Sequence, residues 1–559
     1  MTTVNSEAAQ PQVATKSVAD IVAAWIERTT STDHKSVARL YLGGAFTFLF
    51  VTLIAFGLMR AQLIIPSNSL ISPDVFGQIL SATGISFALL FAIPLALGIA
   101  TLVVPLQIGA RTVALPRINQ FSAWLYLLGG ATIWLSFLYT GPEAGILSLV
   151  PLSELTYTSS HGVDAWVVGV GLVGLGILLW SVNMLATLSV LRAPGMFWRR
   201  APIFTWVTGA FSWLLLIGSP VLLAALTMLT IDRNFGGNFF IAGEGGSPLL
   251  YQHFIYFFFT TVYASVVLFG IGVIGEIFAT FSGGRNQGRV FDRRTTTISL
   301  IVFSVLVPFA YLQNMYSSPV SVGWVSTAQV IALLLIVPLG LIVVNLIRTL
   351  WGGPVETRAP LLYAAAALST MVVGLAIEWL LSILTVGWQY DNTADSQAAT
   401  LLVFIGAAIF AGIAAIYYWL PKITGRFAGE GLGKTGLVIM LVGTYLYAIP
   451  MMFAGLAGQP VDIYRFYEGA GLDTYNLIAS IGAYVFIAGA VLALATLAHG
   501  YSVGRRAGAD PWGGTSLEWL ALSPPAANNF DAVPDVRSDQ PLRDIREAVT
   551  QRTGGSSRA

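Results

Sequence analysis

Long hydrophobic stretches alternate with short polar loops along almost the whole chain. Twelve of these stretches are long enough to supply the roughly 20 apolar residues with which a helix crosses a bilayer. The pattern therefore predicts an all-α, polytopic membrane protein with twelve transmembrane helices. The predicted spans are 39–59, 79–107, 122–141, 164–192, 204–230, 250–282, 296–317, 323–349, 361–388, 396–420, 432–456 and 475–502.

The charges in the loops predict the orientation of these spans. Loops after the even-numbered spans are basic, and the loop after the sixth span alone holds Arg285, Arg289, Arg293 and Arg294. Loops after the odd-numbered spans are mainly acidic. Because cytoplasmic loops carry the excess of Lys and Arg, both termini are expected in the cytoplasm of a prokaryotic cell, with the chain in the inner membrane.

Three segments are expected along the chain. Residues 1–30 form a cytoplasmic N-terminal tail, in which apolar residues at helical spacing predict either a short amphipathic helix on the membrane surface or a frayed end. Residues 31–505 form the twelve-helix membrane domain. Residues 506–559 are polar and rich in proline, and are expected to be a cytoplasmic C-terminal tail.

Composition restricts the chemistry that this protein can perform. Of its 559 residues, 56% are hydrophobic and only 10% are charged, against about 25% charged in a typical soluble domain. The net charge of +1 gives no basic field for nucleic acid. Cysteine is absent, which excludes disulfides, thiolate zinc sites and cysteine-ligated iron–sulfur clusters. The chain has four histidines, His34, His161, His253 and His499.

Loop motifs carry a resemblance to a known family. They occur in family order from Thr32 to the C-terminal segment, and include RAQL from Arg60, VPLQIGAR from Val104, LPRIN from Leu115, PVLLAALTMLTIDRNFG from Pro220, GEIFATFS from Gly275, YYWLPKITGR from Tyr417 and DPWGGTSLEW from Asp510. In these motifs the chain resembles subunit I of the haem-copper terminal oxidases, the catalytic subunit of cytochrome c oxidase. The resemblance implies the same twelve-helix fold.

The resemblance also implies six histidines that hold two haems and one copper ion, and none of the six is present here. The three haem-ligand positions correspond to Thr83, Ala399 and Leu401. The three copper-ligand positions correspond to Thr260, Gln313 and Asn314. Haem iron needs His, Met, Cys or Tyr as axial ligand, and neutral hydroxyl or amide groups are weak copper ligands. We therefore expect no catalytic residue, no haem and no metal.

Other family sites differ in the same way. The resemblance implies an aspartate and a lysine at the entrances of two proton paths, where this chain has Thr112 and Ile342. It also implies an arginine pair that holds the haem propionates, where this chain has Val461 and Asp462. A coordinated loss of this kind favours a change of function over random damage.

Bulky and polar replacements suggest what occupies the vacated space. Phe259 replaces a family glycine and Phe269 a family proline, so we expect Phe259 to plug part of a haem pocket. Thr260, Gln313, Asn314 and Glu378 predict a small polar cavity at the former copper position. The alternative is that these polar groups form ordinary hydrogen bonds between helices.

Four functions follow from these observations. The leading hypothesis is a cofactor-free pseudo-oxidase, a structural or assembly subunit that lies in membrane lipid beside subunit II- or III-like proteins or another respiratory complex. The second is a conduit for protons, ions or small molecules through the vacated cavity, lined by Glu378. The third is an active terminal oxidase that passes electrons from cytochrome c to dioxygen, which the family label implies. The fourth is binding of a quinone or lipid in a relined pocket.

Overall fold

The computed structural model describes residues 29–282, 288–315, 318–351, 355–390 and 392–547. Most of the segment expected as an N-terminal tail lies outside these residues, including its possible amphipathic helix. Within the described residues, twelve helical spans are long and apolar enough to cross a membrane, and no β-strand occurs. The predicted fold class is confirmed.

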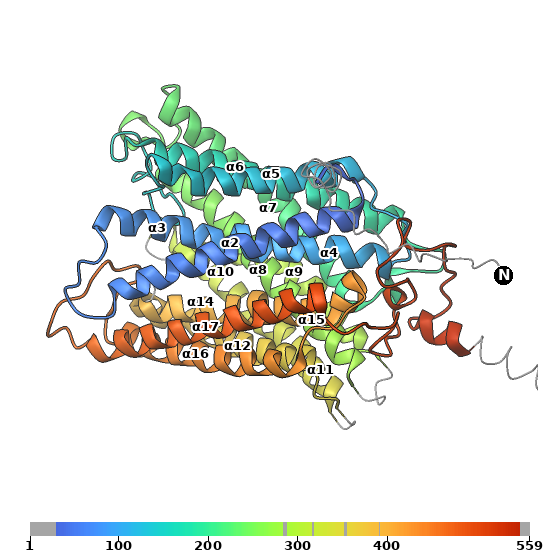
Figure 1. Ribbon diagram of the computed structural model, residues 1–559. Coiled ribbons are helices and arrows are strands. Elements are labelled where there is room, and N and C mark those ends of the chain that lie inside the picture. The colour runs from blue at the N-terminus through green and yellow to red at the C-terminus, as the bar shows by residue number, and fades with distance from the viewer. Residues whose placement is uncertain (1–28, 283–287, 316–317, 352–354, 391, 548–559) are drawn as a thin grey trace, which may run out of the picture.

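The spans run side by side through an elongated bundle (Figure 1). In chain order, the helices are α2 (His34–Gln62), α3 (Pro73–Ile85), α4 (Ile93–Gln107), α5 (Pro116–Leu135), α6 (His161–Val190), α7 (Ile203–Asn234), α8 (Pro248–Thr280), α9 (Arg293–Leu306), α10 (Val322–Leu334), α11 (Ile336–Leu350), α12 (Ala359–Leu381), α13 (Leu384–Tyr390), α14 (Ala394–Phe404), α15 (Ala411–Thr424), α16 (Glu430–Leu456) and α17 (Asp473–Val503).

Several spans are less regular than the hydrophobic pattern indicates. The second span joins α3 to α4 through a π-helical segment, Ser86–Ala92, and the tenth joins α14 to α15 through another, Ile405–Phe410. The seventh span ends in a 3₁₀ segment, Val307–Met315. The predicted span 361–388 is too long, because α12 ends at Leu381 and the separate helix α13 follows.

Glycines allow neighbouring helices to approach closely. A Cβ atom on Gly482 of α17 would lie 2.4 Å from the backbone nitrogen of Tyr447 on α16. A Cβ atom on Gly443 of α16 would lie 2.3 Å from the backbone nitrogen of Phe486 on α17. Small residues have this role in membrane bundles, where lipid is as apolar as the helices and close packing drives association.

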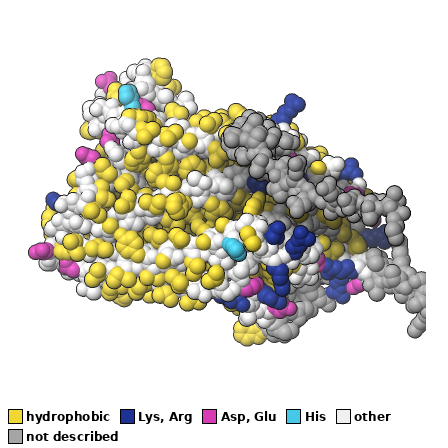
Figure 2. Space-filling view, in the orientation of Figure 1, with side chains coloured by type: hydrophobic (Ala, Val, Ile, Leu, Met, Phe, Trp, Pro, Cys, Tyr) yellow, Lys and Arg dark blue, Asp and Glu magenta, His cyan; other side chains and the backbone are white. Residues whose placement is uncertain are grey.

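Charged side chains are concentrated at the two ends of the bundle. Figure 2 shows Lys and Arg side chains gathered at the end where the described chain begins and finishes, which we call the terminal end. The flank between the two ends is mainly hydrophobic in the same view. This distribution is typical of a protein whose middle lies in hydrocarbon.

The C-terminal segment packs against the terminal end of the bundle. The ammonium group of Lys422 donates to the carbonyl oxygens of Ala521 at 2.7 Å and Ala509 at 3.1 Å. The amide of Gln107 donates to the buried carboxyl group of Glu518 at 3.1 Å. Asn529 lies within hydrogen-bond distance of His34, at the start of α2. The segment from 506 to 547 is thus part of the folded domain rather than a free extension.

A first prediction concerns the contact between α16 and α17. Replacing Gly482 by Val forces its side chain into the backbone of α16, and overpacking of this kind costs about 1–3 kcal/mol. Gly431→Val in α16 is the matched control, because nothing lies within 4 Å of a Cβ atom there. The measurement is the midpoint of thermal unfolding in detergent, which should fall for Gly482→Val and stay unchanged for Gly431→Val. Equal unfolding midpoints for Gly482→Val and Gly431→Val would contradict the close contact between α16 and α17.

A second prediction concerns the pH dependence of stability. Burial raises the pKa of Glu518, while hydrogen bonds and Lys422 oppose the rise. A carboxyl group with a raised folded-state pKa stabilises the fold fully below its unfolded-state pKa, and this contribution is lost as pH rises through the folded-state value. Stability should therefore decrease toward alkaline pH, and Glu518→Gln should make that decrease shallower. Parallel pH profiles for the two proteins would contradict this.

Candidate functional site

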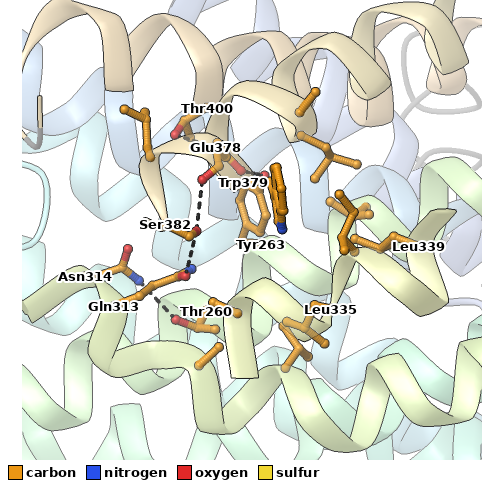
Figure 3. A pocket seen from close by; sticks show the side chains of 18 of the residues that line it. Thr260, Tyr263, Gln313, Asn314, Leu335, Leu339, Glu378, Trp379, Ser382 and Thr400 are labelled. Carbon is orange, nitrogen blue, oxygen red and sulfur yellow. Dashed lines mark hydrogen bonds between the residues drawn. The ribbon is translucent and has the colours of Figure 1, made fainter. Parts of the chain in front are cut away.

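A cavity of about 620 Å³ lies inside the bundle, among residues of α8, α9, α10, α11, α12 and α14 (Figure 3). The structure brings Thr260, Gln313, Asn314 and Glu378 to its wall, although they come from three different spans. The cavity extends well beyond this polar group, because most of its other lining residues are hydrophobic.

Glu378 is the acidic residue of this wall, and two hydroxyl groups donate to it. The Oγ1 atom of Thr400 donates to Oε1 of Glu378 at 2.8 Å, and the hydroxyl group of Tyr263 donates to Oε2. Tyr263 lies on α8, Glu378 on α12 and Thr400 on α14, so the interaction links three helices. Hydrogen bonds to a carboxylate are among the stronger ones in proteins.

A second group of polar contacts lies beside the first. The hydroxyl group of Ser382 lies 3.2 Å from Oε1 of Gln313 and also donates to the backbone oxygen of Glu378 at 2.9 Å. The amide of Asn314 lies 3.4 Å from Oγ1 of Thr260. Figure 3 shows both groups on one side of the cavity, and Leu335 and Leu339 across from them.

The sequence pattern did not single out Tyr263, Thr400, Ser382 or Trp379, all of which line the cavity. Helical spacing from residues already identified in the sequence could have indicated two of them. Tyr263 follows Thr260 by three residues, and Ser382 follows Glu378 by four, which places each pair on one face of its helix. Thr400 pairs with Glu378 only through tertiary packing.

Phe259 is the residue predicted to plug part of a haem pocket. Its ring packs edge to face against Phe258, with centroids 5.2 Å apart, and lies on the cavity wall. Phe269 is fully buried in the core.

The three positions that the resemblance assigns to haem ligands lie in different surroundings. Thr83 is buried on α3, and its hydroxyl oxygen has no hydrogen-bond partner among the described residues. Ala399 is fully buried on α14, where a Cβ atom on Gly374 of α12 would lie 2.8 Å from its carbonyl oxygen. Leu401 packs against two clusters of the hydrophobic core.

Some polar groups at membrane depth instead form ordinary hydrogen bonds between helices. The amide of Asn345 on α11 donates to Oγ1 of Thr296 on α9 at 3.0 Å. The amide of Gln397, near the start of α14, instead donates at 2.7 Å to the carboxylate of Asp462, which lies in the exposed loop between α16 and α17. Both interpretations drawn from the sequence thus have structural counterparts, at different places in the bundle.

None of the four histidines lines the cavity. His34 lies at the start of α2, within hydrogen-bond distance of the carbonyl oxygen of Thr101. His161 begins α6 beside Asp164. His253, in the second turn of α8, lies 2.9 Å from the hydroxyl group of Tyr311. His499 lies near the end of α17. The described residues also contain no cluster of three or more His, Cys, Asp or Glu side chains that could hold a metal ion.

The fold defines a polytopic helical membrane protein with an internal cavity, and comparisons with known proteins identify the family. Residues 36–485 match the family described as cytochrome c and quinol oxidase polypeptide I. The chain is 33% identical to cytochrome c oxidase subunit 1 of Bacillus subtilis over 517 residues, which cover 92% of this chain and 82% of that protein. The chain belongs to this family.

Two further comparisons agree with this assignment. The chain is 29% identical to quinol oxidase subunit 1 of Bacillus spizizenii over 531 residues, covering 94% of this chain and 81% of the relative. Its fold is similar to that of a haem-copper terminal oxidase dimer solved by cryo-electron microscopy. The TM-score is 0.72 at 13% identity, with 92% of this chain and 90% of the other covered.

A third prediction tests the link between α8 and α12. Tyr263→Phe removes a donor to the half-buried carboxyl group of Glu378, and a hydrogen bond to a charged group contributes about 1.5–3 kcal/mol. Glu378→Leu removes the acceptor, and the double variant should lose less than the sum of the two, with a coupling of about 0.5–3 kcal/mol. The free energies come from chemical unfolding in detergent.

Tyr445→Phe on α16 is the control, because its hydroxyl group has no hydrogen bond within the described part of the chain. Combined with Glu378→Leu, it should give additive effects. If the effects of Tyr263→Phe and Glu378→Leu on the free energy of unfolding were also additive, Tyr263 and Glu378 would not interact.

Proposed function

We propose that this chain is a cofactor-free member of its family, a pseudo-oxidase that serves as a structural or assembly subunit of a respiratory membrane complex. The observation that carries the proposal is the chemistry of the cavity wall. The positions expected to hold copper are Thr260, Gln313 and Asn314, which offer a hydroxyl group and two amides. Neutral groups of this kind do not form a copper site of useful affinity.

Haem fits these surroundings no better. The expected axial ligands correspond to Thr83, Ala399 and Leu401, none of which is an axial ligand for haem iron. Where the resemblance implies arginines for the propionates, Asp462 presents a carboxylate that accepts from Gln397 at 2.7 Å. A carboxylate repels a propionate of the same charge. The residues therefore do not fit haem.

The scaffold is what this chain shares with active oxidases. Family members work with other oxidase subunits, and we propose that this chain pairs with a subunit II- or III-like protein or with another respiratory complex. We also propose that it lies in the inner membrane of a prokaryotic cell. The basic terminal end would then face the cytoplasm, because positive loops remain on that side.

Two other functions remain as alternatives to this proposal. Oxidase activity is what the names of the relatives indicate, and it would need ligands that are absent from the cavity wall. A proton or ion conduit would need polar groups on both sides of the cavity. Leu335 and Leu339, which lie across from Glu378 in Figure 3, are hydrophobic, and the buried Ile342 replaces the expected lysine.

A fourth prediction tests the proposal directly. The protein purified from membranes of a haem-producing host should give no haem in a pyridine haemochrome spectrum and no copper by elemental analysis. Subunit 1 of the Bacillus subtilis oxidase, expressed and purified in the same way, is the positive control. About two haems and one copper ion per chain would overturn the proposal and restore the oxidase.

A further inference from the structure

The cavity has two chemically different sides. Glu378, Ser382, Gln313, Asn314 and Thr260 present carboxyl, hydroxyl and amide groups from one side. Leu335 and Leu339 lie across from them, and most of the remaining residues that line the cavity are aliphatic or aromatic. An occupant that satisfies both sides has a small polar head and a larger hydrocarbon part.

The polar side also selects the charge of the occupant. No Lys, Arg or His is found among the described residues that line the cavity. An anionic head would lie beside Glu378 without a counter-charge, which is unfavourable in an apolar interior. The carboxyl oxygens of Glu378 already accept from Tyr263 and Thr400 and can accept once more from a hydroxyl group. The amide groups of Gln313 and Asn314 can donate to a hydroxyl or carbonyl oxygen.

Access to the cavity is available from the lipid-facing surface. Ile336 at the start of α11 is 41% exposed and also lines the cavity. Ala376 on α12 is likewise exposed and lines it. The indole nitrogen of Trp379 donates to the carbonyl oxygen of Leu333 at 3.2 Å, so α12 adjoins the span that α10 and α11 form. The apolar part of an occupant could pass between these helices from the bilayer.

We propose that the cavity is a binding site for an uncharged lipid whose head carries a hydroxyl or carbonyl oxygen. The head lies between Glu378 and the amides of Gln313 and Asn314, and the hydrocarbon part lies against Leu335, Leu339 and Val343. Neutral glycerides and long-chain alcohols have this chemistry, and so do membrane quinones. The inference rests on the proposed function, because a haem would take the same space.

Gly340 provides a test that does not disturb the packing. It lies on α11 and lines the cavity, and nothing lies within 4 Å of a Cβ atom placed on it. Gly340→Phe therefore directs a ring into open space and should fill part of the cavity. Gly323→Phe on α10 is the matched control, since Gly323 also has nothing within 4 Å of a Cβ atom and does not line the cavity.

The fifth prediction uses native mass spectrometry of the full chain in detergent at pH 8, with three probes. Dodecan-1-ol and a decyl-substituted benzoquinone are neutral, and dodecanoate matches the alcohol in chain length but carries a negative charge. At least one neutral probe should bind in a single copy, at least tenfold more tightly than dodecanoate. Gly340→Phe should weaken that binding at least tenfold, and Gly323→Phe should leave it unchanged.

Glu378→Gln gives a further test, the preference for the alcohol over dodecanoate. A purely structural role of Glu378 would not change this preference. The substitution replaces the ionisable carboxyl group by a neutral amide that keeps an oxygen acceptor, so the preference for alcohol over dodecanoate should fall. Tighter binding of the quinone identifies the quinone pool as the source of the lipid, and tighter binding of the alcohol identifies neutral glycerides or alcohols.

Equal binding of dodecanoate and dodecan-1-ol by the wild-type chain would overturn the inference. So would undiminished binding in Gly340→Phe, or no binding of either neutral probe. Haem is assayed on the same sample, so a failure of the proposed function can be distinguished from a failure of the lipid-binding inference. Bound haem would overturn the proposed function together with the inference, whereas a haem-free chain that binds no neutral probe would overturn the inference alone.

Discussion

Polar groups between apolar helices must find their partners inside this protein, because hydrocarbon offers none. The carboxyl group of Glu378 shows the constraint most clearly. It accepts from Tyr263 on α8 and Thr400 on α14, so a single acidic side chain ties three helices together around the cavity. The same rule holds at the terminal end, where Lys422 and Glu518 are buried and find partners in the C-terminal segment and in Gln107.

Two of the spans depart from straight α-helices. The π-helical segments Ser86–Ala92 and Ile405–Phe410 interrupt two of the most buried spans, and such segments occur frequently at functional sites. Phe87 in the first segment and Phe404, which precedes the second, have ring centroids 5.7 Å apart. Phe404 also lines the cavity.

The residues that pack the helices differ from the residues that line the cavity, and this separation explains how one fold serves different functions. Helix packing depends on small residues such as Gly443 and Gly482, far from the cavity, and these contacts do not require a cofactor. The chemistry of the cavity depends on a few side chains at its wall. Fold and function can therefore change independently, and family membership by itself does not decide whether the chain transfers electrons.

The sequence by itself determined the fold class, the twelve spans and their approximate ends, because a bilayer demands about 20 consecutive apolar residues and loop composition marks each boundary. It also identified Thr260, Gln313, Asn314 and Glu378 as polar residues at membrane depth. Tertiary structure alone decided that these residues share one wall, that Tyr263 and Thr400 complete it, and that Phe259 lies on the same cavity. Those outcomes depend on the rotation and spacing of helices that are distant in the sequence, which a hydrophobic pattern does not encode.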